Sequence, residues 1–193
     1  RRGVIQCNIK KSEDALASFE EQLRRFPAGV WAAEAVFQSG WIQYKLSKYD
    51  QAVVFFQRYA ASWKTGNRLT DAFFWQGMSL YRQKKHDEAI GVFSRLATEH
   101  AGTAIAGRAL VQSALCSLAK KDAEDARKTL QAVIRDSRYR EVQDEALFEL
   151  SRSWLATDQP DMARVFVNRL SEEFPQSQWT PEAVFRLGEY YFN

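Results

Sequence analysis

The sequence predicts an all-α protein built from short antiparallel helix pairs, and three observations favour this fold class. Glycine (9) and proline (4) are too scarce in 193 residues for an all-β protein, which needs a turn about every ten residues. A hydrophobic content of 46% supports a continuous core, while 26% charged residues nearly balance to a net charge of +3. This balance excludes a self-repelling disordered chain and gives no strong footprint for nucleic acid. The third observation, after the scarcity of glycine and proline and the hydrophobic content, is a period of 37 residues that runs through the chain.

The repeat is clearest in two columns of alanine that recur without a miss. They are Ala15, Ala52, Ala89, Ala126 and Ala163, and Ala35, Ala72, Ala109, Ala146 and Ala183. A third column holds only small residues: Gly3, Gly40, Gly77, Ala114, Ser151 and Gly188. A fourth holds large apolar ones: Phe19, Phe56, Phe93, Leu130 and Val167. We expect the small residue of the first helix in each unit to face the alanine of the second, so that the two helices approach closely.

Each unit is expected to contain two helices, because its apolar positions recur at helical spacing. An acidic column, at Glu13, Asp50, Asp87, Glu124 and Asp161, marks the start of each second helix, where the positive end of the helix dipole favours an anion. In the first unit Lys10 and Lys11 are expected to end the first helix. The predicted organisation is one array over residues 1–193, with units at 1–27 (partial), 33–64, 70–101, 107–138, 144–175 and 180–193 (partial). This array is expected to be a fragment of a longer one.

The pattern resembles the tetratricopeptide repeat (TPR) family across the whole chain. The resemblance rests on Gly40, Ala52 and Phe56 and on the helix-ending pairs Phe26-Pro27 and Phe174-Pro175. It implies a right-handed superhelical solenoid of antiparallel helix pairs that binds proteins or peptides. The 37-residue unit resembles the subgroup found in bacterial envelope proteins, namely lipoproteins of the β-barrel assembly machinery and Tol-Pal-associated coordinators of cell division.

The residue pattern does not indicate an enzyme, a metal site or a cofactor. His86 and His100 are the only histidines, and they are expected at opposite ends of one helix, about 20 Å apart, which excludes joint ligation of a metal within that unit. No nucleophile elbow, zinc-protease motif or phosphate-binding glycine loop occurs. Cys7 and Cys116 lie three repeats apart and are expected to be unpaired thiols. No apolar run is long enough for a transmembrane helix.

Recognition is expected on the first helix of each unit, which in the TPR family lines the concave groove. Positions 37, 41 and 44 share one helix face. In the first two full units this face is aromatic with a basic rim, and its expected partner-binding residues are Phe37, Trp41, Tyr44, Phe74, Trp75, Met78, Tyr81 and Arg82. In later units it reads Phe148, Arg152, Leu155 and Phe185, Glu189, Phe192, so that its polarity increases. A second interpretation, in which the aromatic residues only pack the repeat, stays open.

A basic cluster follows the second helix of the third full unit. It consists of Arg135, Arg138 and Arg140. The cluster has two interpretations, a contact for an anionic partner or a solvated loop. Family members that grip a C-terminal carboxylate present lysine and asparagine on the first-helix face, where this chain has Phe37 and Trp41, so a clamp of that kind is not expected here.

The hypothesis for function is a non-catalytic scaffold that binds a protein or peptide partner in bacterial cell-envelope assembly. Two alternatives stay open: a helical accessory part of a larger enzyme, such as a lytic transglycosylase, and a purely structural spacer array. The resemblance implies a periplasmic or outer-membrane-associated protein, with the cytoplasm as the other compartment. Val184, Leu187 and Tyr191 are expected to face a neighbour that is missing from this stretch, which predicts end-to-end self-association through uncapped terminal helices.

Overall fold

A computed structural model describes residues 2–192, with side chains from residue 10 onward, and every regular element within this range is a helix. The fold-class prediction of an all-α array is therefore confirmed for the described residues. The helices are α1 (Arg2–Arg25), α2 (Ala32–Lys45), α3 (Tyr49–Ser62), α4 (Leu69–Arg82), α5 (His86–Glu99), α6 (Ala104–Ala119), α7 (Ala123–Arg135), the 3₁₀ helix η1 (Ser137–Val142), α8 (Gln143–Leu155), α9 (Pro160–Glu173) and α10 (Trp179–Phe192).

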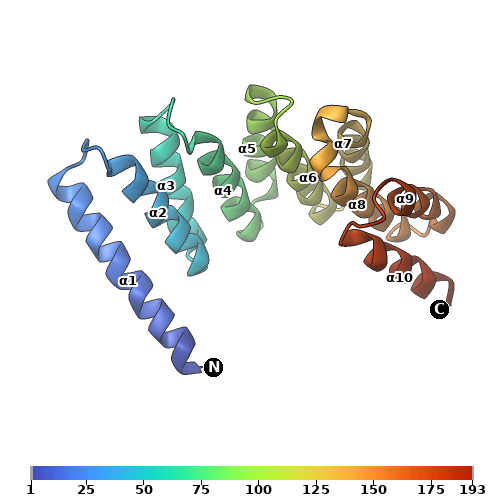
Figure 1. Cartoon of the computed structure of the whole chain (residues 1–193), viewed down its shortest axis with the longest axis horizontal. Coiled ribbons are helices and arrows are strands. Elements are labelled where there is room, and N and C mark those ends of the chain that lie inside the picture. Colours follow the sequence, from blue (N-terminus) through green and yellow to red (C-terminus); the bar gives the residue numbers. More distant parts are fainter. Residues whose placement is uncertain (1, 193) are drawn as a thin grey trace. The chain divides into compact units, whose positions relative to one another are not determined.

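The chain forms two compact units, residues 1–92 (unit 1) and residues 93–193 (unit 2). In unit 1, α2 packs against α3, α3 packs against α4, and α1 packs against α2 (Figure 1). In unit 2, α6 packs against α7 and α8 against α9, while α10 contacts both α8 and α9. Within each unit, consecutive helices therefore cover one another as the repeat predicts.

The contact between α2 and α3 shows why the repeat needs small residues. A Cβ atom added to Gly40 would lie 2.9 Å from Cε1 of Phe56 and 3.1 Å from Cβ of Phe55. Phe56 is fully buried, and its ring lies 5.6 Å from that of Phe37. Ala52 is also fully buried. The close approach that the alanine and glycine columns predict is therefore present in this helix pair.

The turns inside the helix pairs share one backbone geometry. Ser47, Lys84, Lys121 and Asp158 all have a positive φ, between 59° and 66°, and they occupy one column of the repeat. In the first of these turns Lys48 N donates to Gln43 O and Ser47 N donates to Tyr44 O, at 2.9 Å each. This is the Schellman arrangement, in which a left-handed residue lets two free carbonyls of the helix end accept hydrogen bonds.

The first unit of the repeat departs from its prediction. Lys10 occupies the column of these turns, yet it lies inside α1, which is one continuous helix from Arg2 to Arg25. The prediction of a helix that ends at Lys10 and Lys11 and a second that starts at Glu13 is wrong.

The core of unit 2 includes the 3₁₀ helix η1 between α7 and α8. Tyr139 and Val142 of η1 are buried, and they pack against Gly107 of α6, where an added Cβ atom would lie 2.9 Å from a side-chain atom of each. The Tyr139 hydroxyl accepts a hydrogen bond of 3.2 Å from Gly102 N. The segment that follows α7 is thus an ordered part of the core.

Candidate partner-binding surfaces

The first candidate surface is a cluster of three aromatic side chains on α2 and α4 of unit 1. The rings of Trp41 and Trp75 meet edge to face, with centroids 4.3 Å apart. Tyr44 stacks beside Trp41 at 5.9 Å and lies 5.0 Å from Trp75. We call Trp41, Tyr44 and Trp75 the aromatic cluster. It joins two successive first helices of the repeat.

The structure places the eight predicted partner-binding residues in three different environments. Phe37 is only 5% exposed and packs against Phe56 and Tyr59 of α3. It therefore belongs to the core and not to the predicted surface. Arg82 is exposed. The remaining six are half-buried: Trp41, Tyr44, Phe74, Trp75, Met78 and Tyr81.

Position along the helix explains why Phe37 is buried although it shares a face with Tyr44. Phe37 lies near the start of α2, where the later part of α3 covers it and the Arg68 guanidinium lies 4.8 Å from its ring centre. Tyr44 lies near the end of α2 and meets Tyr49 and Trp75 instead. Whether a residue on this face is exposed therefore depends on its position along the helix as well as on its angle around the helix axis.

Basic groups border the aromatic cluster. Lys45 Nζ lies 5.1 Å from the centre of the Trp41 ring, a favourable cation–π distance. A side-chain hydrogen bond with Tyr44 raises the pKa of the Arg82 guanidinium, which places this cation at the edge of the cluster. Half-buried indole rings with a cationic edge are typical of surfaces that bind apolar or aromatic groups of a protein partner.

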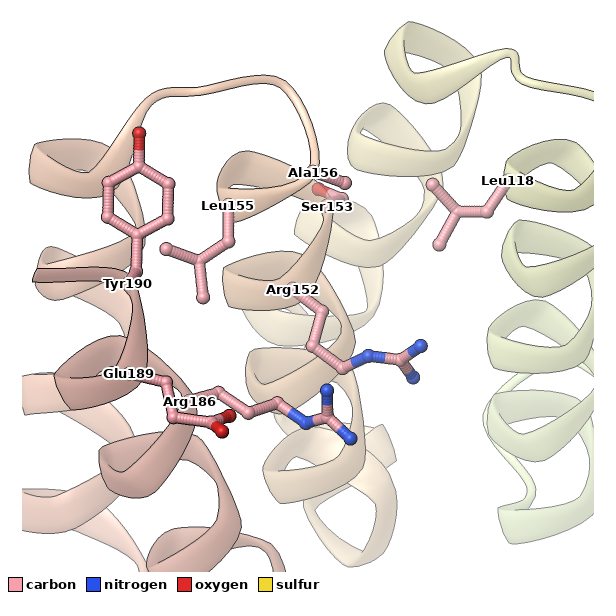
Figure 2. A pocket seen from close by; sticks show the side chains of 8 residues that line it. All are labelled: Leu118, Arg152, Ser153, Leu155, Ala156, Arg186, Glu189 and Tyr190. Atoms are coloured by element: carbon pink, nitrogen blue, oxygen red, sulfur yellow. The ribbon is translucent and has the colours of Figure 1, made fainter. Parts of the chain in front are cut away.

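The second candidate surface is a hollow of about 540 Å³ in unit 2 (Figure 2). Three successive first helices, α6, α8 and α10, and Ala156, which directly follows α8, contribute its lining: Leu118, Arg152, Ser153, Leu155, Ala156, Arg186, Glu189 and Tyr190. Figure 2 shows the side chains of Arg152 and Arg186 both extending toward the side of the hollow where Leu118 lies. The lining thus contains separate apolar side chains and two guanidinium groups.

The charges around the hollow are partly compensated. Arg152 Nη1 donates to both carboxylate oxygens of Glu149 at 2.8 Å. Burial raises the pKa of Glu149, while Arg152 opposes this shift. Arg186 Nε donates to Glu182 Oε1 at 2.7 Å. Both of these carboxylates lie outside the lining, so Glu189 is the one acidic residue among the eight lining residues.

The paired arginines of the hollow were not recognised as a site from the sequence, although the repeat contains the signal. Adding three repeats of 37 residues to positions 41 and 75 gives 152 and 186. Arg152 and Arg186 therefore occupy the register positions at which unit 1 has Trp41 and Trp75. The pair becomes apparent only when the repeat positions of two neighbouring first helices are compared.

The arginines after α7 mostly have partners within unit 2. Arg138 pairs with Asp136 at 2.6 Å, and Arg140 Nη1 lies 3.1 Å from Glu173 Oε2. The Arg140 guanidinium also lies 4.0 Å from the centre of the Phe174 ring. These two side chains hold the η1 segment against its neighbours. Arg135 is exposed at the end of α7.

Groups that could support chemistry are few among the described residues. No cluster of three or more histidine, cysteine, aspartate or glutamate residues in this range could hold a metal ion. Cys116 is buried and unpaired, and burial raises the pKa of its thiol to about 12, so it is unreactive at neutral pH. The side chain of Cys7 lies outside the described residues. No described helix is both long and apolar enough to cross a membrane.

Repeated helix pairs joined by identical turns define a helical-repeat protein, and comparison with known proteins identifies the kind of repeat. Residues 26–181 match the family described as a tetratricopeptide repeat-like domain. The chain belongs to this family, which confirms the resemblance at the family level. A search of curated proteins found no match.

Solved structures with a similar fold include several tetratricopeptide repeat proteins. MamA from Desulfovibrio magneticus RS-1 is 18% identical, with a TM-score of 0.69 over 92% of this chain and 95% of that one. YrrB, described as a TPR protein with an unusual peptide-binding site, is 17% identical, with a TM-score of 0.64 over 93% and 86%. PilW, a type IV pilus biogenesis factor, is 19% identical, with a TM-score of 0.69 over 95% and 80%. At these identities the likeness concerns the fold.

Proposed function

We propose that this protein is a non-catalytic scaffold whose aromatic cluster binds a peptide or protein partner. The observation that carries the proposal is the pairing of Trp41 with Trp75 on two successive first helices, where both indoles are half-buried and keep part of their surface exposed. The repeat itself does not require tryptophan there, since the same columns hold Arg152 and Arg186 in unit 2. Phe74, Met78, Tyr81 and Arg82 extend the proposed surface along α4.

The energetics of protein interfaces support this choice of residues. Tryptophan and tyrosine are enriched among the few side chains that dominate binding energy. The ring contacts within the cluster also fix the side chains before a partner arrives, so that binding costs less conformational entropy. YrrB, a TPR protein with a peptide-binding site, gives a precedent for this kind of ligand on a similar fold.

Trp75→Ala is expected to weaken binding of the natural partner by roughly thirtyfold, the equivalent of about 2 kcal/mol. Trp75 contacts both other members of the cluster, so its removal deletes an anchor and loosens Trp41 and Tyr44. The partner is to be isolated by affinity capture with the wild-type chain, and its affinity for each variant measured by calorimetry. Trp41→Ala is expected to act in the same direction.

The control for this experiment is Arg135→Ala, because Arg135 is exposed on α7 and belongs to unit 2, whereas the aromatic cluster belongs to unit 1. It is expected to leave the affinity unchanged, and far-ultraviolet circular dichroism should show equal helicity for all variants. Equal affinities for Trp75→Ala, Trp41→Ala and wild type would contradict the proposal and favour a packing role for both tryptophans.

We further propose that the protein acts in a bacterial cell envelope, in the periplasm or at the outer membrane. The 37-residue repeat, which resembles the unit of envelope TPR proteins, supports this assignment. The fold likeness to PilW, a pilus biogenesis factor, agrees with it. Fractionation of cells that produce the tagged full-length protein tests the proposal, and recovery in the cytosol alone would contradict it.

Self-association through the terminal helices is a separate proposal, and α10 supports it. Phe185 is 61% exposed, whereas Phe37, at the same position of the repeat, is 5% exposed. Gly188 has no atom within 4 Å of an added Cβ, although Gly40 in the same column receives the Phe56 ring. Val184 and Tyr191 are exposed as expected, while Leu187 packs partly against the core of unit 2.

Sedimentation velocity of this chain is expected to show a mass that rises with concentration, because α10 exposes the face that a second helix covers in the other pairs. Phe185→Glu should abolish this rise. Val54→Glu on α3 is the matched control, since Val54 is 63% exposed but lies on a different helix. A constant monomer mass for the wild-type chain would disprove self-association.

A further inference from the structure

The loop between α1 and α2, residues 26–31, exposes three large apolar side chains. Phe26 is 63% exposed, Val30 is 92% exposed and Trp31 is 70% exposed. Residues 27–29 are proline, alanine and glycine and are exposed as well, so the loop has no polar side chain. Figure 1 shows that the loop projects from the ends of α1 and α2. We call residues 26–31 the apolar tip.

The backbone of the apolar tip is the ordinary one for this repeat. Gly29 N donates to Phe26 O at 3.1 Å, and Ala32 N donates to Gly29 O at 2.9 Å. Residues 63–69 and 174–180 contain the same two turns at the equivalent positions. The apolar tip therefore differs from these loops in its side chains and not in its fold.

The exposure of Val30 belongs to its place in the repeat. Asn67, Glu141 and Gln178 hold the same column and are exposed too, while Ala104, the remaining member, is half-buried. The repeat thus turns this position toward solvent even where a helix pair precedes the loop. Packing of the repeat gives no reason for a valine here, and an exposed patch of this kind marks a surface that binds something else.

The size and composition of the apolar tip favour a lipid surface over a protein partner. A protein interface of standard size buries about 800 Å² on each partner, of which six residues supply only a part. Phe26 and Trp31 flank the tip and Val30 lies between them, which suits a bilayer, where indole rings prefer the level of the headgroups. The two turns also bond part of the loop backbone internally, which lowers the cost of moving its polar groups out of water.

The charges beside the apolar tip do not oppose contact with a bilayer. Arg24 and Arg25 at the end of α1 both pair with Glu21. Together with Glu20, the charges of these two helix turns balance. Both arginines are largely exposed, and their long side chains can reach headgroups while the tip lies deeper. Binding is therefore expected to depend on the apolar side chains more than on anionic lipids.

We propose that the apolar tip inserts into the surface of a lipid bilayer and attaches the protein peripherally to a membrane. Val30 enters the boundary of the acyl chains, and Phe26 and Trp31 lie at the level of the headgroups. The attachment is reversible, because three side chains bury far less apolar surface than a spanning helix does. This surface is separate from the aromatic cluster and does not depend on the function proposed for that cluster.

A nitrobenzoxadiazole label at Val30→Cys, in the full chain with Cys7→Ser, reports on the environment of the apolar tip. Cys116 is buried and its thiol has a pKa of about 12, so it stays unlabelled. Vesicles of phosphatidylethanolamine with a minor fraction of phosphatidylglycerol are expected to shift the emission of the label to the blue and raise its intensity, and vesicles of phosphatidylcholine alone should do the same. Asn67→Cys with the same label is the matched control, since Asn67 is exposed at the same position of the next loop, and it should show no change.

Val30→Asn provides a test without a label, because it copies the residue of the next loop. In vesicle flotation this variant is expected to lower the partition coefficient by about tenfold, as loss of one buried aliphatic side chain does. Val54→Asn on α3 is the control, since Val54 is also an exposed valine, at 63%, and it should partition as the wild type does. Both positions are exposed, so circular dichroism should show equal helicity for the two variants.

Three outcomes would overturn the proposal. An unchanged spectrum of the label at position 30 with both kinds of vesicle would show that the apolar tip does not enter a bilayer. Equal changes at positions 30 and 67 would show general adsorption of the protein. A blue shift at position 30 that grows with protein concentration in the absence of vesicles would assign the tip to a contact with a second copy of the chain.

Discussion

Gly40→Ala is expected to destabilise the protein by about 1 to 3 kcal/mol, whereas Gly188→Ala, at the same position of the repeat, is expected to stabilise it by about 0.5 to 1 kcal/mol. The new Cβ of Gly40→Ala would lie 2.9 Å from Cε1 of the fully buried Phe56. At Gly188 nothing lies within 4 Å, so alanine only restricts the unfolded chain and favours the helix. The two variants should therefore differ by about 3 kcal/mol.

Urea denaturation followed by far-ultraviolet circular dichroism measures both free energies of unfolding. Phe56→Leu combined with Gly40→Ala tests the origin of the effect, since a smaller, flexible side chain should relieve part of the overlap and give a non-additive cycle. Equal effects of alanine at Gly40 and Gly188 would mean that α2 and α3 do not approach as closely as described. Additive effects of the double variant would place the strain elsewhere.

The sequence predicts the helices of this protein well because buried positions recur with the same period of 37 residues as the residue types. Ala52, Ala89, Ala126 and Ala163 are all fully buried, whereas Ala15 of the same column, in the continuous helix α1, is half-buried. A position that is buried on both sides tolerates only one size of side chain, so the column stays constant. The pattern therefore contains enough information to predict each helix pair.

The turn geometry was not predictable to the same degree. Ser47, Lys84, Lys121 and Asp158 share a left-handed backbone, but none of them is glycine, the residue that normally reveals such a conformation. Lys10, like Lys84, is followed by a second lysine, and yet Lys10 lies within a helix. A pair of lysines alone therefore does not specify the left-handed turn.

The candidate surfaces were predictable in part. Helical spacing correctly places Trp41 and Tyr44 on one face, but it does not reveal that Phe37 lies under α3 at the other end of the helix. The contact between Trp41 and Trp75 also depends on the packing of one helix against the next but one. Single-helix patterns lack this information, and for the same reason they did not reveal Arg152 and Arg186 as a pair.

Gln143, the first residue of α8, has a role for which the sequence offers no signal. Its column otherwise contains Ala32, Leu69, Ala106 and Thr180, and its side chain is buried. Nε2 of Gln143 donates to Ile134 O at 3.1 Å and to Asp136 O at 3.0 Å, while Oε1 accepts from Arg140 at 3.2 Å. One amide thus satisfies the end of α7 and joins it to the start of α8.

Gln143→Leu is expected to destabilise the protein by about 2 to 3 kcal/mol, because it leaves the buried Ile134 carbonyl without this donor and removes the acceptor for Arg140. The replacement has a similar volume, so the loss reports on hydrogen bonds rather than on a cavity. Gln57→Leu is the matched control, since Gln57 is exposed on α3, and it should change stability by less than about 0.5 kcal/mol. Hydrogen exchange should locate the loss of protection in η1 and the last turn of α7. If both leucine variants unfold at the same urea concentration as wild type, the Gln143 amide is not needed to join α7 to α8, and the packing of Tyr139 and Val142 alone holds that junction.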